Sequence, residues 1–146
     1  MKQILVSKNR IVFLSIVLVT IFSYGQNIKK HQWENRVLLI FSEDKNSQEF
    51  KNQIEILKKE KQGLKERKLI IYQFSKNQFT TNFNSVWCSS NLSIKKYVNR
   101  NEDFKVILIG LDGGEKLAQN TILTTEKLFS IIDGMPMRKR EVRNNR

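Results

Sequence analysis

Val37-Leu38-Leu39-Ile40-Phe41 is the stretch that decides the fold, and two later runs, 69–72 and 106–110, are built in the same way. Each run is continuously apolar and rich in β-branched residues, without alternation of apolar and polar positions. This pattern is typical of strands that are buried on both faces of a sheet. The sequence therefore predicts three strands inside a sheet that is covered on both sides.

A helix is predicted between the first two runs. Residues 48–62 place apolar side chains at helical spacing, Ser47 has the hydroxyl of an N-cap, and Gly63 is expected to end the helix. The apolar positions of this helix are Phe50, Ile54 and Leu57. Two strands joined by a helix through short connections form a βαβ unit, which gives parallel strands.

The second half of the chain predicts a variable segment, a hairpin and a final helix. Residues 75–93 show no clear period and are long for a loop, and 94–98 suit a brief helix. Asp112-Gly113 favours a tight turn into an antiparallel strand around 116–118. A last helix from about Thr125 is expected to kink or end at Pro136.

The predicted order is therefore β-α-β, a variable segment, then β-β-α. This order is typical of an α/β, thioredoxin-like fold with a mixed sheet and helices on both faces. The expected organisation is a signal peptide at 1–25, a lead-in at 26–35, the thioredoxin-like domain at 36–137 and a basic C-terminal tail at 138–146.

The signal peptide is predicted from three features of the N-terminus. Lys2, Lys8 and Arg10 form a positive region without acids, and residues 11–22 form a run free of charge. Small residues precede a cleavage site after Gly25. Because a membrane-spanning helix needs about 20 apolar residues, the run indicates export to the periplasm or the exterior rather than a membrane anchor.

The mature chain is strongly basic and poor in metal ligands. Loss of residues 1–25 lowers the net charge from +12 to +9, since three cations and no acids leave. This charge favours an acidic protein, an acidic glycan or an anionic envelope surface as partner, with no firm signal for nucleic acid. A single cysteine, Cys88, and a single histidine, His31, exclude an internal disulfide and a structural zinc site. No cofactor is predicted.

A thioredoxin-like fold raises the question of whether the chain has a redox site. A thioredoxin-type site needs a thiolate at the start of the helix after the first strand, where the helix dipole lowers the cysteine pKa. The corresponding segment, 42–47, contains no cysteine, and Pro136 is the only proline. Dithiol exchange is therefore excluded, which leaves Cys88, in Trp87-Cys88-Ser89-Ser90, as the one alternative catalytic residue.

Two further groups of residues, the adjacent carboxylates and a basic and aromatic segment, have a structural interpretation as well as a functional one. The carboxylate pairs at 43–44 and 102–103 suit solvated turns rather than acid–base catalysis. Basic and aromatic residues between 74 and 87 form either a stacking surface for sugars or bases, or a segment that packs its aromatics onto the sheet. The residues of this segment are Lys76, Phe79, Phe83 and Trp87.

Four stretches of the chain together resemble one family. They are residues 32–41, 66–69, 104–114 with Lys116, and 128–138 with Arg140 and Glu141. The family is the domain-of-unknown-function 4174 group, a peroxiredoxin-like group of bacterial exported and animal extracellular-matrix proteins. The resemblance implies a thioredoxin-like fold and no established activity, because its members generally lack the redox cysteines.

One charged cluster near the C-terminus is a candidate binding site. Asp133, Arg138, Arg140 and Glu141 flank Pro136. They form either an ion-pair network at the end of the last helix or a grip for an acidic partner. The sequence thus favours an exported, non-catalytic binding or envelope-associated module, with a single-cysteine thiol oxidoreductase or peroxidase that uses Cys88 as the alternative.

Overall fold

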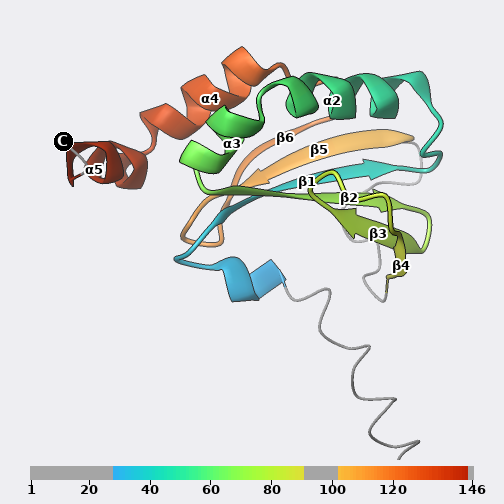
Figure 1. Ribbon diagram of the computed structural model, residues 1–146, viewed down its shortest axis with the longest axis horizontal. Helices are drawn as coiled ribbons and strands as arrows, with labels where there is room; N and C mark the ends of the chain where they lie inside the picture. Colours follow the sequence, from blue (N-terminus) through green and yellow to red (C-terminus); the bar gives the residue numbers. More distant parts are fainter. Residues whose placement is uncertain (1–27, 91–101, 145–146) are drawn as a thin grey trace, which may run out of the picture.

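A computed structural model describes residues 28–90 and 102–144. One mixed sheet of six strands, in the order β4-β3-β2-β1-β5-β6, forms the centre of the fold (Figure 1). The strands are β1 (Arg36–Ser42), β2 (Leu69–Ser75), β3 (Gln78–Thr81), β4 (Cys88–Ser89), β5 (Phe104–Ile109) and β6 (Glu115–Gln119). The helices are η2 (Ile28–His31), α2 (Gln48–Lys59), α3 (Lys61–Glu66), α4 (Thr125–Gly134) and α5 (Pro136–Asn144).

Strand β1 lies at the centre of the sheet and is buried along its whole length. It pairs with β2 in parallel and with β5 antiparallel, so that Leu38 lies opposite both Ile71 and Leu108. The three predicted strands and the antiparallel return strand are therefore confirmed. The α/β class with a mixed sheet is confirmed as well.

The helices α2, α3 and α4 cover one face of the sheet (Figure 1). Alternate residues of β1, Leu38 and Ile40, point into the apolar cluster beneath these helices. Buried Gln53 of α2 ties the loop before α4 to this layer, because its side-chain amide exchanges hydrogen bonds with the backbone of Leu123 at 2.7 and 3.0 Å. Leu57, Leu128 and Ile132 complete the centre of the cluster.

The opposite face of the sheet carries aromatic side chains. Phe41 and Phe74 stack with ring centroids 4.9 Å apart, and Tyr72 and Phe79 join the same cluster. The described helix on this side is the 3-10 helix η2, whose His31 lies 2.8 Å from the Tyr72 hydroxyl. Burial, followed by the charge of Lys30, lowers the pKa of His31, and burial raises the pKa of Tyr72. The two faces thus differ in the elements that cover them.

Helix α2 begins as the sequence predicts but ends earlier. The Ser47 side chain accepts a hydrogen bond from the Phe50 amide, which confirms the N-cap. The expectation that Gly63 ends this helix is wrong, because α2 ends at Lys59 and Gly63 lies within α3. A Cβ at Gly63 would lie 2.8 Å from the Phe129 ring, so any other residue here would force this ring of α4 to shift.

The variable segment contains two short strands, β3 and β4, at one edge of the sheet. The backbone amide of Asn82 donates to Ile71 O (2.6 Å), and its side-chain oxygen accepts from Ile71 N (3.2 Å). These bonds end the pairing of β3 with β2. The brief helix predicted at 94–98 lies outside the described residues.

The C-terminal elements follow the predicted turn and kink. Gly113 has a φ of +80°, as the predicted tight turn requires, and Pro136 separates α4 from α5. The segment predicted as a basic tail from 138 onward continues α5 to Asn144. Among the described helices, none combines the length and apolar character that a bilayer crossing demands.

Candidate functional site

The start of α2, where the fold places a redox thiolate, is polar and acidic. Ser42 Oγ donates to Asp44 O at 2.8 Å, and Ser47 Oγ caps the helix, so two hydroxyls stand at this helix end. A cavity of about 480 Å³ opens beside them. Five carboxylates line it, from Glu43, Asp44, Glu49, Glu102 and Asp103.

The charge of this cavity opposes thiolate chemistry. A thiolate beside carboxylates is disfavoured, because like charges favour the neutral form of a titrating group. The described residues around the cavity include no cysteine or histidine that would act as nucleophile or base. In the described part of the chain, no group of His, Cys, Asp and Glu is arranged to hold a metal ion.

Cys88 does not line the acidic cavity at the start of α2. It is an exposed free cysteine in the two-residue edge strand β4, opposite Phe79. It also does not line either of two further cavities in the described part of the chain, one beside α3 and one beside η2. No described side chain makes a hydrogen bond or ion pair with its thiol. Its neighbour Trp87 turns toward α2, with its ring centroid 6.3 Å from that of Phe50.

The aromatic residues of the variable segment do not form one surface. Phe79 is buried in the aromatic cluster on one face of the sheet, whereas Phe83 and Trp87 pack against the helix-covered cluster on the other. Lys76 is exposed in the turn between β2 and β3. The structure therefore supports the packing interpretation of this segment, not a continuous stacking surface.

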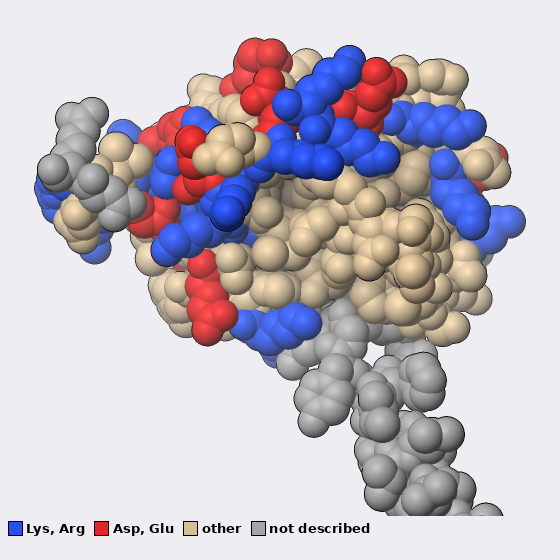
Figure 2. Space-filling model, in the orientation of Figure 1, with Lys and Arg blue, Asp and Glu red and all other residues tan. Residues whose placement is uncertain are grey.

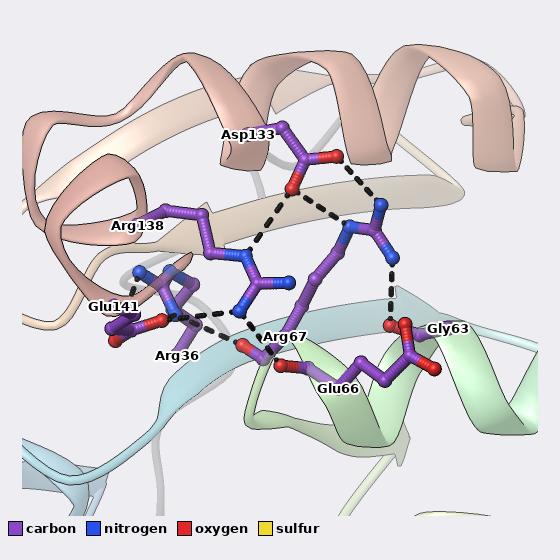
Figure 3. A network of polar contacts seen from close by, with 7 residues as sticks. All are labelled: Arg36, Gly63, Glu66, Arg67, Asp133, Arg138 and Glu141. Atoms are coloured by element: carbon purple, nitrogen blue, oxygen red, sulfur yellow. Dashed lines mark hydrogen bonds and ion pairs between the residues drawn. The ribbon is translucent and has the colours of Figure 1, made fainter. Parts of the chain in front are cut away.

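Three of the four charged residues predicted near the C-terminus meet in one network (Figure 3). Asp133 at the end of α4 accepts hydrogen bonds from Arg67 at 2.6 and 3.1 Å and from Arg138 at 3.3 Å. Arg138 also donates to Glu66 O at 2.9 Å, and the guanidinium of Arg67 lies 4.0 Å from the centroid of the Phe129 ring. These contacts clamp α4 and α5 onto α3.

Glu141 of α5 reaches the start of the central strand. It forms an ion pair with Arg36 at 3.3 Å and another with Arg138 at 3.4 Å. The Arg36 side chain is fully buried, donates to Arg67 O at 3.0 Å, and leaves its Nε without a partner. A buried guanidinium needs a counter-charge, and Glu141 supplies it.

Arg140 stands apart from this network. It is exposed on α5 together with Lys139 and Arg143, and the side chains of these three residues make no ion pair with any described residue. The sequence pattern groups Arg140 with Asp133, Arg138 and Glu141, but it gives no role to Arg36 and Arg67. Both arginines lie inside the stretches that carry the family resemblance, and Arg36 directly precedes the apolar run 37–41; these two features are the signals that point to them.

Replacing Glu141 with Gln is expected to lower the free energy of unfolding by roughly 2–3 kcal/mol. The change leaves the Arg36 charge without a counter-charge, and the loss is below that of a fully buried pair because Glu141 is 17% exposed. Urea unfolding measures the change. The matched control, Arg140→Gln on the same helix, is expected to stay within about 0.5 kcal/mol. Equal stability of both variants would contradict the anchoring role of Glu141.

Asp133 is expected to make stability fall in acid. Its burial acts to raise the pKa of Asp133, but the hydrogen bonds and charges of Arg67 and Arg138 outweigh burial and lower the pKa below its usual 3.8. The carboxylate therefore stabilises the fold above about pH 4, and this contribution is lost as the pH falls through the lowered pKa. In urea unfolding, the stability difference between the native chain and Asp133→Asn should be constant above pH 5 and shrink below pH 4. A difference that does not depend on pH would refute this assignment.

Comparison with known proteins agrees with this geometry. The crystal structure of the reduced 2-Cys peroxiredoxin of Plasmodium vivax superimposes with a TM-score of 0.57 at 13% sequence identity, covering 77% of this chain and 72% of that chain. This similarity confirms the thioredoxin-like fold. No curated protein sequence matches the chain. Residues 27–141 match the family model described as Domain of unknown function (DUF4174), and the chain therefore belongs to the DUF4174 family.

Proposed function

We propose that the protein is an exported, non-catalytic binding module that uses a thioredoxin-like scaffold to hold an anionic partner. The observation that carries the proposal is the start of α2, where hydroxyls and carboxylates occupy the place of a redox thiolate. In this setting the helix dipole stabilises no reactive sulfur. The domain would then act by binding its partner with surface residues.

The outward side of α5 is the surface that suits an anionic partner. Arg138 and Glu141 hold one side of the helix against the domain, which leaves Lys139, Arg140 and Arg143 directed away from it. These three cations lie on one helix face and form no ion pair with a described carboxylate, so they attract an anionic envelope surface through long-range charge. Export itself is proposed from the N-terminal sequence, which lies outside the described residues.

A thiol oxidoreductase or peroxidase that uses Cys88 is the second candidate. The exposure of this thiol on an edge strand is the observation that favours it. A single thiol reduces a hydroperoxide by giving up two electrons, and it becomes a sulfenic acid that an external thiol must reduce. The described residues provide no resolving cysteine for this step.

Peroxide and disulfide assays distinguish the two candidates. The purified protein, supplied with excess dithiothreitol, is expected to consume hydrogen peroxide and to reduce insulin disulfides no faster than dithiothreitol alone. Cys88→Ser is expected to leave both rates unchanged. Turnover above the dithiothreitol background that Cys88→Ser abolishes would establish the enzyme and overturn the non-catalytic proposal.

Vesicle binding tests the α5 surface. Replacing Lys139, Arg140 and Arg143 with Gln is expected to weaken binding to phosphatidylglycerol vesicles by up to about 100-fold, because each cation near an anionic surface contributes about 1 kcal/mol. Co-sedimentation at low and high salt measures the effect, and high salt should weaken binding of the native chain.

The control for vesicle binding removes the same charge elsewhere. Lys51→Gln, Lys58→Gln and Lys76→Asn change three exposed lysines on α2 and in the β2–β3 turn. Asn is chosen at Lys76 because its φ is +50°, which Asn tolerates. An equal loss of binding in this control, or binding that ignores salt, would show that α5 is not the docking surface.

A further inference from the structure

A second cavity lies at the edge of the sheet where β3 leaves β2, close to α3. Its volume is about 370 Å³, near the lower end of small-molecule sites, which span about 300–1,000 Å³. Apolar residues from α3, β2 and the segment after β3 form part of its lining, and these are Leu64, Leu69, Ile70, Ile71 and Phe83. The cavity is separate from the acidic cavity and from the outward side of α5.

The strand edge at this cavity offers a backbone donor. Asn82 closes the pairing at Ile71, and alternate residues of a strand direct their backbone groups to the same neighbour. Leu69 therefore turns its N–H and C=O toward the same edge as Ile71. The chain after Asn82 does not pair there, because Asn84 N bonds to Thr81 O. No described strand covers Leu69 on this side.

Three ammonium groups surround the apolar lining. Lys61, Lys65 and Lys68 line the cavity and are exposed, and no acidic residue lines it. No ion pair joins these three lysines to a described carboxylate. Lys61 Nζ lies 5.6 Å from the centroid of the Phe83 ring. Figure 2 shows Lys and Arg side chains along the border of a broad surface without charged side chains, below α2 and α3. The cavity thus combines apolar walls with positive charge.

We propose that this cavity binds a single-chain anionic amphiphile. The carboxylate or phosphate head pairs with the lysines and with the Leu69 N–H, and the hydrocarbon chain lies against Leu64 and Phe83. A peptide strand is a poorer fit, because strand addition needs a row of open backbone groups and the open edge here amounts to Leu69. The inference goes beyond the proposed α5 surface and stands on different residues.

The test uses dodecanoate and dodecyl phosphate below their micellar concentrations, with dodecyltrimethylammonium as the cation of equal chain length. Calorimetry measures affinity, and amide shifts of Leu69 and Ile71 locate the site. The pocket variant carries Lys61→Gln, Lys65→Gln and Lys68→Asn, with Asn at the position where φ is +49°. The control is the variant with Lys51→Gln, Lys58→Gln and Lys76→Asn, which loses the same charge.

Both anions are expected to bind and to shift the two amides, and the cation should bind at least about tenfold more weakly. The pocket variant should weaken dodecanoate binding about tenfold through the loss of three exposed ion pairs, and the control should bind like the native chain. Tighter binding of dodecanoate would identify the natural ligand as a fatty acid, and tighter binding of dodecyl phosphate would identify it as a phosphate amphiphile. Absence of dodecanoate binding, equal binding of the cation, or equal losses in both variants would overturn the proposal. The pocket variant leaves the cations of α5 unchanged. The amphiphile test can therefore fail while the vesicle test succeeds, and the reverse also holds.

Discussion

The burial of β1 on both faces is the constraint from which the rest of the fold follows. Its alternate residues supply both apolar clusters, Leu38 and Ile40 beneath the helices and Val37, Leu39 and Phe41 on the aromatic side. A shift of one residue in its pairing would turn the helix-facing residues to the aromatic side and the aromatic-facing residues to the helices. Phe41 would then no longer stack on Phe74. The register of β1 therefore fixes which face of the sheet receives α2 and α4.

Arg36 extends this constraint to the C-terminus. It begins the central strand and is fully buried, so its charge must be met by a group from another element. Glu141 meets it across 105 residues of sequence, which places α5 against the domain and directs its remaining cations outward. The anchoring network and the proposed docking surface are thus two sides of one helix. The family match, which extends to residue 141, covers the network and ends before Arg143.

The features predicted correctly are those that local sequence determines. Continuous apolar runs predict buried strands, and the Ser47 cap and the turn at Gly113 depend on residues a few positions apart. The misplaced helix end at Gly63 has a different cause, since this glycine accommodates a ring from α4 that lies 66 positions later. The network was recognised only at its C-terminal half, because Arg67 and Asp133 are also 66 residues apart and no periodicity connects them.

Net charge alone gives a misleading picture of the surface, because the charges are separated into regions of opposite sign. Five carboxylates line the cavity at the start of α2, while lysines surround the apolar cavity beside α3. In a redox protein of this fold, the positive end of the helix dipole favours a thiolate, and anionic neighbours would work against it. An acidic cavity at this helix end is therefore compatible with the scaffold only when no sulfur has to ionise there. Because no sulfur has to ionise at the start of α2, the cations that suit anionic molecules lie elsewhere, beside α3 and on the outward side of α5.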